Sequence, residues 1–265
     1  MSRIIPKKKL GQHFLQDQDV VDRTVAAANL SSSDVVLEIG PGPGILTKTL
    51  LKSPIKKLYS LEIDPQFFSR LKPLESEYPD RFQLIMSDAL QFPLSKLDEP
   101  KIKIIANLPY NIGTTLIIRW LGELNKITSM TLMVQKEVAE RIAGAPSTKS
   151  YGSLSILCQI KCEVQKLFDV PPQAFNPPPQ VMSSVLQLVP KDQTLSDEEL
   201  TNLENLTQLV FQQRRKMIRV SLKQLNIENL ESLLEKNGFN PMDRPEDLSI
   251  EQFVRLSRLF EKSVS

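Results

Sequence analysis

The sequence has few of the residues that build disulfide frameworks and metal sites. Its 265 residues include only two cysteines, Cys158 and Cys162, and a single histidine, His13. Two cysteines cannot form a disulfide framework and suit a reducing compartment, and one histidine leaves a zinc site almost without ligands. We therefore expect no bound metal, and we expect both cysteines to be packing residues.

Long hydrophobic runs and an excess of one charge are also missing. No apolar stretch approaches the ~20 residues that a membrane-spanning helix needs, and no apolar segment of the secretory kind follows the basic N-terminus. With 33 basic and 31 acidic residues the net charge is only +2, so any affinity for nucleic acid must be local. We expect a cytoplasmic, monomeric protein with no membrane partner.

Glycine is scarce too, with nine residues in the chain, yet three of the nine alternate within the segment 40–44. They follow the apolar run 35–39, which is typical of a buried parallel strand, and Ile45 begins a segment able to form a helix. Strand, glycine-rich turn and helix together indicate a nucleotide-type cradle, because a glycine backbone can approach a ligand closely. A glycine-rich turn without a ligand is the alternative for this stretch alone.

The spacing of this turn distinguishes between nucleotide ligands. A dinucleotide fingerprint needs glycine or alanine where the chain has Ile45, and no lysine follows in the arrangement of a triphosphate-binding loop. The spacing is Glu-x-Gly-x-Gly-x-Gly starting from Glu38, which resembles the first motif of methyltransferases that use S-adenosylmethionine (SAM). We therefore expect SAM in this cradle.

Strand-like runs alternate with helical segments before residue 190. The predicted strands cover 35–39, 57–64, 81–86, 101–106, 130–135 and 184–189, and the predicted helices include 17–30, 113–125 and 136–143. This alternation predicts βαβ units and a mostly parallel sheet. After a change of composition near 190 the pattern is helical and polar. We expect an α/β catalytic domain over residues 1–190 and a small all-helical domain over 191–265.

Acidic residues stand at the ends of two predicted strands, where doubly wound sheets bind their ligands. Glu62 lies 22 positions after Gly40, and a carboxylate there can accept hydrogen bonds from both hydroxyls of a ribose. An ordinary exposed charge is the alternative. Asp88 follows the third strand and is placed either to accept from an adenine amine or to cap a helix.

The most informative tetrapeptide is Asn107-Leu-Pro-Tyr110, at the end of the fourth strand. An exocyclic amine is a poor nucleophile because its lone pair is delocalised into the ring, and two acceptors on its hydrogens restore that lone pair to nitrogen. The Asn107 side chain and the Leu108 carbonyl offer two acceptors, Pro109 fixes the turn, and Tyr110 can stack on the base. A base in a duplex cannot reach such a site, so the target must be unpaired or flipped out. A simple turn is the alternative.

Two further segments favour contact with RNA. Phe175 begins the stiff, proline-rich segment 175–181, in which proline fixes the backbone, and an aromatic ring there can stack on an unpaired base. A basic cluster lies after residue 211, and a solvated helix face is its alternative explanation. Its predicted RNA-binding members are Arg214, Arg215, Lys216 and Arg219.

Along nearly its whole length the sequence is similar to the KsgA-type small-subunit rRNA adenine dimethyltransferases. The resemblance lies in residues 10–15, 37–44, 62, 87–89, 107–110, 151–155, 175–181 and 211–216. It implies a Rossmann-like SAM-dependent methyltransferase domain with a small helical C-terminal domain. It also implies dimethylation at N6 of two adjacent adenosines in the 3′-terminal hairpin of 16S rRNA, within the small ribosomal subunit. SAM would leave as S-adenosylhomocysteine, and the protein would act in subunit biogenesis.

The resemblance also assigns residues. The positions that contact SAM in the family correspond to His13, Leu15, Gly40, Glu62, Asp88 and Asn107. The positions that hold the target base correspond to Asn107, Leu108, Pro109, Tyr110 and Phe175. His13 stands where many relatives have asparagine, a mild departure because either side chain forms hydrogen bonds. Gln180 replaces a frequent basic residue, which puts only a possible RNA contact in doubt.

Three alternatives share part of this pattern. The erythromycin-resistance 23S rRNA methyltransferases have the same catalytic motifs, but the 211–216 cluster and the helical tail favour the small-subunit family. A mitochondrial relative acting as a transcription factor would be a binding protein, and the intact motif set argues against it. A DNA adenine methyltransferase would share the Asn-Pro-Pro-Tyr type of chemistry, but the tail has no evident DNA-reading motif.

Overall fold

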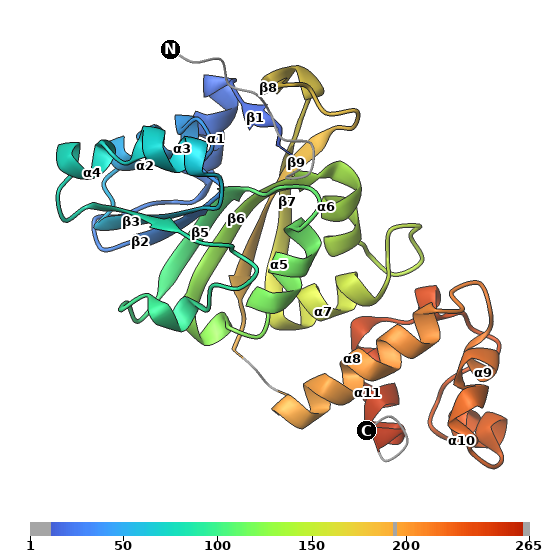
Figure 1. The fold of residues 1–265 in the computed structure, drawn as a ribbon. Helices are drawn as coiled ribbons and strands as arrows, with labels where there is room; N and C mark the ends of the chain where they lie inside the picture. Colours follow the sequence, from blue (N-terminus) through green and yellow to red (C-terminus); the bar gives the residue numbers. More distant parts are fainter. Residues whose placement is uncertain (1–11, 193–194, 262–265) are drawn as a thin grey trace. The chain divides into compact units, whose positions relative to one another are not determined.

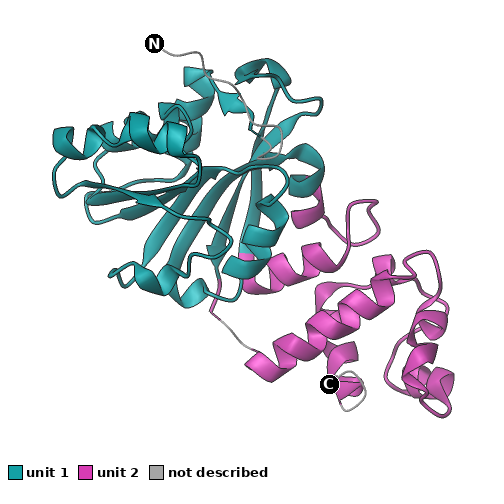
Figure 2. Ribbon diagram, in the orientation of Figure 1, with its two compact units in different colours: residues 1–139, 163–190 teal, residues 140–162, 191–265 magenta. Residues whose placement is uncertain are grey.

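The computed structural model describes residues 12–192 and 195–261, so the basic N-terminal run and residues 10–11 of the first shared segment lie outside it. The chain divides into two compact units, drawn in two colours in Figure 2. We name Met1–Ala139 with Glu163–Pro190 the sheet unit, and Glu140–Cys162 with Lys191–Ser265 the helical unit. The predicted boundary near 190 is one of three points where the chain passes between units.

The sheet unit is built on seven strands: β2 (Val35–Ile39), β3 (Lys57–Glu62), β4 (Phe82–Met86), β5 (Ile102–Asn107), β6 (Ile127–Gln135), β7 (Cys162–Val170) and β9 (Ser183–Pro190). Their order in the sheet is β4-β3-β2-β5-β6-β9-β7 (Figure 1). Strands β2 to β6 pair in parallel, and β9 runs antiparallel to β6. The mostly parallel sheet and the α/β class expected from the sequence are therefore confirmed.

Helices of the sheet unit pack on this sheet through apolar side chains. They are α1 (Gln18–Ala27), α2 (Ile45–Lys52), α3 (Pro65–Leu71), α4 (Leu74–Glu77), α5 (Gly113–Trp120) and the first residues of α6 (Lys136–Ile142), which continues into the helical unit, with short 3₁₀ turns at Leu94–Lys96, Leu124–Lys126 and Pro172–Ala174. Val21 of α1 and Leu50 of α2 share one core with Leu58 of β3 and are fully buried. Helix α3 begins where Asp64 accepts a hydrogen bond from the Gln66 amide and Pro65 takes the first helical position.

A second, two-stranded sheet joins the first described residues to the proline-rich segment. Strand β1 (Phe14–Leu15) pairs antiparallel with β8 (Phe175–Asn176), with Leu15 opposite Phe175, and Figure 1 shows the two strands side by side. The Gln16 amide adds a 2.8 Å hydrogen bond to the carbonyl of Ala174. Segments about 160 residues apart in the chain are thereby held together.

The helical unit has its own core. Its helices are α7 (Ser153–Lys161), α8 (Asp197–Phe211), α9 (Ile218–Ser221), α10 (Leu230–Lys236) and α11 (Ile250–Leu259), with 3₁₀ turns at Leu222–Leu225 and Pro245–Asp247. Tyr151 and Ile156 share this core with Leu203 and Phe253, which explains why residues 140–162 belong to this unit. Beyond residue 190 the described residues contain no strand, as expected from the sequence.

Both cysteines are buried and unpaired, which confirms the expectation that they are packing residues. Burial raises the pKa of each thiol to about 12. Among the described residues, no helix combines the length and the apolar character needed to cross a membrane.

Candidate active site

A cavity of about 210 Å³ lies in the sheet unit where β2, β3 and β5 end. Its wall includes the predicted SAM-binding residues His13, Leu15, Gly40, Glu62, Asp88 and Asn107, together with Leu108, Pro109 and Tyr110. These residues come from five separate segments of the sequence. The carboxyl ends of parallel strands meet at one edge of a sheet, and this geometry brings them together.

The glycine-rich turn forms one wall of the cavity because its backbone adopts conformations that other residues avoid. Gly42 and Gly44 have φ angles of +52° and +88°, in the left-handed region where a Cβ is strained. A Cβ on Gly42 would lie 3.1 Å from the Phe14 ring, and one on Gly44 would lie 2.5 Å from Leu71. The turn therefore packs against β1 on one side and α3 on the other.

Glu38 supports the turn from beneath. Its carboxylate is 1% exposed and accepts hydrogen bonds from the Thr47 hydroxyl, at 3.1 and 2.9 Å, and from the Ser60 hydroxyl, at 2.7 Å. Burial raises the pKa of Glu38 to about 7, because desolvation outweighs the hydroxyl hydrogen bonds that favour the charged form. The three side chains tie β2, α2 and β3 together below the cavity.

Glu62 lies at the end of β3 and is 4% exposed. One carboxylate oxygen accepts from the Gly42 amide at 3.1 Å, and the other accepts from the Asp64 amide at 2.7 Å. Burial raises the pKa of Glu62, while hydrogen bonds from the amides of Asp64, Gly42 and Ile63 act in the opposite direction. A carboxylate has about four acceptor positions, so Glu62 keeps acceptor capacity for a ligand hydroxyl. The alternative of an exposed strand-end charge is wrong.

Asp88 caps a turn rather than a helix, and its contact with an adenine amine stays a prediction. Its Oδ1 accepts a hydrogen bond from the Leu90 amide at 2.9 Å, in the manner of a cap, and the residue also lines the cavity. One oxygen therefore fixes the local turn, and the other has no hydrogen bond from the described residues.

The tetrapeptide at the end of β5 is held by neighbours on both sides. The Asn107 Nδ2 donates to the backbone carbonyl of His13 at 3.2 Å, and the Leu108 amide donates to Met133 at 3.0 Å. Tyr110 places its hydroxyl 2.6 Å from the Ser183 hydroxyl, and burial raises the pKa of this phenol. The tetrapeptide is thus bonded to β6, to β9 and to His13, the residue before β1.

Phe175, the remaining predicted contact to the target base, is 3% exposed. It packs in the core of the sheet unit with Leu15 and Ala174, and it is not part of the cavity wall. The structure therefore places it outside the cavity wall, and its contact with a base stays a prediction.

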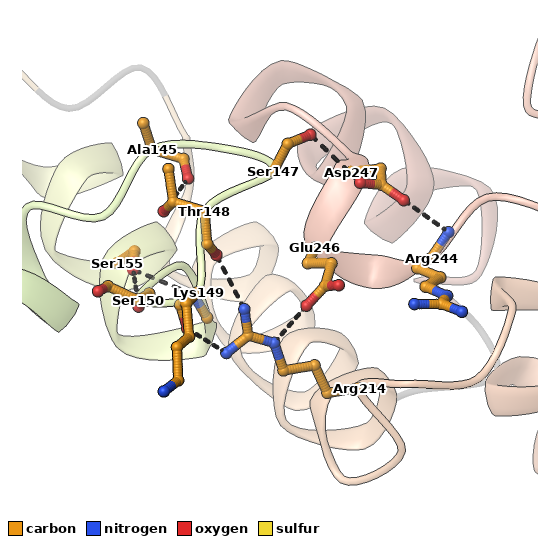
Figure 3. Close-up of polar contacts among 11 residues, drawn as sticks. Ala145, Ser147, Thr148, Lys149, Ser150, Ser155, Arg214, Arg244, Glu246 and Asp247 are labelled. Atoms are coloured by element: carbon orange, nitrogen blue, oxygen red, sulfur yellow. Dashed lines mark hydrogen bonds and ion pairs between the residues drawn. The ribbon is translucent and has the colours of Figure 1, made fainter.

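The predicted RNA-binding residues fall into two groups. Arg214 is engaged within the helical unit, where its guanidinium pairs with Glu246 and donates to the carbonyls of Thr148 and Lys149 (Figure 3). Arg219 pairs with Glu231 at 3.0 Å. Arg215 and Lys216 are exposed, and their side chains form no hydrogen bond or ion pair with the described part of the chain. Of these four residues, Arg215 and Lys216 can therefore bind a phosphate without first losing an internal ion pair or hydrogen bond.

Three features of the site were not predicted. The partners of Glu38 (Thr47 and Ser60), the Ser183 hydroxyl bound to Tyr110, and the Phe14 ring against Gly42 all depend on contacts between distant segments. No local pattern in the sequence signals them.

Within residues 12–192 and 195–261 no group of three or more histidine, cysteine or acidic residues has the arrangement of a metal site.

The chain matches known proteins in sequence over nearly its full length. The family model described as ribosomal RNA adenine dimethylase matches residues 5–262. A ribosomal RNA small subunit methyltransferase A from Chelativorans sp. (strain BNC1) is 42% identical over 96% of this chain and 93% of the relative. Its counterpart from Ehrlichia chaffeensis is 41% identical over 97% of both chains.

Solved structures agree with the sequence relatives. A dimethyladenosine transferase from Plasmodium falciparum superposes with a TM-score of 0.79 and 29% identity, over 95% of this chain and 98% of the other. The 23S rRNA methyltransferase ErmE gives a TM-score of 0.72 and 27% identity, over 93% and 98%. The Rossmann-like methyltransferase fold and the family resemblance expected from the motifs are both confirmed. The chain belongs to the ribosomal RNA adenine dimethylase family.

Proposed function

We propose that this protein uses SAM to dimethylate the N6 amines of two adjacent adenosines in the 3′-terminal hairpin of 16S rRNA, within the small ribosomal subunit. One observation carries the proposal: two acceptor oxygens stand on consecutive residues at the cavity wall. The Asn107 Nδ2 is bonded to the His13 carbonyl, so the amide oxygen is its free end. Neither this oxygen nor the Leu108 carbonyl receives a hydrogen bond from the described residues.

Two neighbouring acceptors match an exocyclic amine, which has two hydrogens to donate. When both hydrogens are bound, the nitrogen lone pair leaves conjugation with the ring and becomes available for attack. Tyr110 stacks on the base and Pro109 keeps the turn rigid. In this proposal the rate depends on holding the amine in line with the methyl donor, and the proton becomes acidic as nitrogen gains its new bond.

The residues at the glycine-rich turn fit SAM. The Glu62 carboxylate keeps acceptor capacity for a ribose hydroxyl, and Gly40 and Gly42 of the turn place no Cβ between their backbone and the cavity. We propose that Leu15, Gly40, Glu62, Asp88 and Asn107 hold it, together with the backbone at His13. When bound, SAM supplies an electrophilic methyl group and leaves as S-adenosylhomocysteine. The chain's own part is to bind, orient and exclude water.

An adenine must be unpaired or flipped out to reach this cavity. Tyr110 supplies the stacking surface. We propose Phe175, which is 3% exposed, as the second aromatic residue of this platform. Arg215 and Lys216, with Arg214 and Arg219 beside them, are the proposed contacts to the rRNA backbone.

The small-subunit target is favoured over the 23S alternative by the degree of similarity. The two relatives named for the small subunit are 41% and 42% identical to this chain, and ErmE is 27% identical. We further propose a cytoplasmic monomer that acts in small-subunit biogenesis.

The proposal is tested by incubating the protein with labelled SAM and undermethylated 30S subunits, 50S subunits or naked rRNA, and mapping the labelled base. Label on two adjacent adenosines near the 3′ end of 16S rRNA is the expected result. Label on 23S rRNA alone would establish the erythromycin-resistance type of target instead. Absence of label from every adenosine would refute the proposed reaction.

A further inference from the structure

The His13 imidazole connects two segments that the chain separates by about 65 residues. Its Nδ1 lies 2.8 Å from the Pro177 carbonyl oxygen, and because a carbonyl only accepts, Nδ1 must carry the hydrogen. Its ring stacks on Tyr110, with 5.4 Å between ring centroids and 29° between ring planes. The imidazole is therefore engaged on one side by the proline-rich segment and on the other by the tetrapeptide.

The backbone of His13 makes a separate contact, in which its carbonyl oxygen accepts from the Asn107 Nδ2 at 3.2 Å. This bond turns the Asn107 amide so that the oxygen is its free end. Any residue at position 13 supplies the same carbonyl, so substitution of the side chain leaves this contact possible. The roles of backbone and side chain at position 13 can therefore be measured separately.

Tyr110 is restrained at two points. Its hydroxyl lies 2.6 Å from the Ser183 hydroxyl, and one face of its ring lies against His13. A stacking residue that is already fixed does not lose conformational freedom when the base arrives, so binding energy is not spent on ordering it. Loss of the His13 ring would free the Tyr110 ring to rotate about its Cβ–Cγ bond while the hydroxyl contact remains.

We propose that the His13 side chain is a positioning residue for the target adenine, acting through Tyr110 and Pro177. It sets the plane of the Tyr110 ring and ties the 175–179 segment to it. This role differs from the cofactor contact that the family resemblance assigns to position 13. The inference rests on the proposed function, since it concerns the adenine that this function supplies.

Three substitutions separate the two contacts of the ring. His13→Phe keeps a ring beside Tyr110 and loses the donor to Pro177, His13→Asn keeps a donor and loses the ring, and His13→Ala loses both. We expect the single-turnover rate of methyl transfer on undermethylated 30S subunits to fall about tenfold in His13→Ala and about threefold in each of the other two. The dissociation constant for SAM, measured by calorimetry, should change by less than about twofold.

A spectroscopic measurement reports on the base itself. With 2-aminopurine in place of the target adenine in an RNA hairpin, stacking on Tyr110 quenches the fluorescence, and we expect weaker quenching in His13→Ala than in His13→Phe. A general loss of structure would lower SAM affinity in all three variants, so SAM affinity and thermal melting serve as the folding control.

The outcomes distinguish this inference from the proposed function. If His13→Ala weakens SAM binding as much as it slows transfer, the side chain is a cofactor contact and the inference is overturned. Unchanged transfer and unchanged quenching in His13→Ala and His13→Phe overturn it as well, while leaving the wild-type reaction intact. A wild-type protein that methylates no adenosine refutes the proposed function, and the inference with it.

Discussion

Asn107 shows how a single residue becomes an acceptor by having its donor occupied. An amide side chain carries both a donor and an acceptor end, and in isolation it can turn either way. The His13 carbonyl, 3.2 Å from the Asn107 Nδ2, accepts only, so it selects the orientation in which the oxygen is free. Pairing between β1 and β8 holds His13 in place. The acceptor therefore depends on residues that are remote in sequence.

We expect Asn107→Ala to lower the single-turnover rate of methyl transfer by about 100-fold or more, because one of two acceptors for the amine is removed at the reacting atom. Melting should change by only a few degrees, since the side chain contributes one hydrogen bond, about 1 kcal/mol. Asn125→Ala is the matched control, because Asn125 is an exposed asparagine of the same unit. Near-wild-type turnover by Asn107→Ala would contradict the proposed mechanism.

Glu38 gives the sheet unit a dependence on pH. Burial raises the pKa of this carboxyl from 4.5 to about 7, so between these values the native state binds a proton that the unfolded chain has lost. The free energy of unfolding therefore falls as pH rises through this window. The free energy of unfolding falls by about 3 kcal/mol in total across the window. Below the lower of the two pKa values both states hold the proton, so this carboxyl causes no fall there.

We expect Glu38→Gln to remove this slope, because glutamine does not titrate. The measurement is urea unfolding of wild type and variant at about pH 5 and about pH 8. Over that range of pH, the unfolding free energy of wild type should fall by about 3 kcal/mol relative to that of Glu38→Gln. Glu77→Gln, at an exposed position of α4, should follow the wild type. Parallel curves for wild type and Glu38→Gln would show that the buried carboxyl does not titrate in this range.

At the scale of elements, the link between β2 and α2 depends on a backbone that only glycine adopts easily. Gly44 has φ = +88° as the residue before α2, and its missing Cβ would lie 2.5 Å from the end of Leu71. Leu71 is 3% exposed and has little room to move. The close approach of the turn to α3 therefore depends on glycine at position 44.

Gly44→Ala should lower the free energy of unfolding by about 2 kcal/mol, from the left-handed backbone and the displaced Leu71 together. Chemical denaturation measures this directly, and SAM affinity should fall in parallel because the turn forms the cavity wall. Gly152→Ala is the comparison, since no atom lies within 4 Å of its added Cβ, and its cost should stay below about 1 kcal/mol. If both substitutions lowered the free energy of unfolding equally, the argument from the backbone conformation of Gly44 would be wrong.

Elements with a strong local pattern were predictable, and those that depend on distant partners were not. Strands β2 to β6 and β9 are apolar runs, and each lies close to its predicted position. Strand β7 (Cys162–Val170) escaped prediction because it lies at the sheet edge, where only its ends are fully buried. Strands β1 and β8 have two residues each and exist only through their mutual pairing.

The same distinction holds for the site. The residues expected to contact SAM all line the cavity, because motif spacing places them at strand ends. Phe175 does not, since the sequence shows a stiff aromatic segment but not the direction in which its ring packs. The His13 contacts to Tyr110 and Pro177 lay beyond prediction for the same reason.

At the scale of the whole molecule, the cavity and the predicted basic cluster lie in two units with separate cores. The sheet unit holds the entire cavity wall, and the helical unit holds the predicted basic cluster. The chain enters the helical unit early, through residues 140–162, and leaves it again before β9. The change of composition near residue 190 indicates the last point where the chain passes between the units. Residues 140–162 have the same apolar character as the sheet unit, so their composition does not indicate that they belong to the helical unit.

The helical unit uses its arginines for two purposes, which makes the origin of RNA affinity testable. Arg214 fastens the 144–150 loop to the turn at Pro245–Asp247 through Glu246 and two carbonyls (Figure 3). Arg215 and Lys216 beside it are exposed. A charge that already has internal partners releases fewer counterions on binding than one that meets a phosphate directly.

We expect Arg215→Ala with Lys216→Ala to weaken rRNA binding and to reduce the slope of log affinity against log salt by about 2, one for each phosphate that is no longer neutralised. Arg214→Ala should leave this slope nearly unchanged and instead destabilise the helical unit by about 2 kcal/mol, because a partly buried carboxylate and two carbonyls lose their donor. Binding of a 16S rRNA fragment across a salt series, beside urea unfolding of each variant, separates the two effects. A reduced slope in Arg214→Ala with an unchanged slope in the double variant would reverse the assignment, since it would mean that Arg214 leaves the loop carbonyls to bind a phosphate.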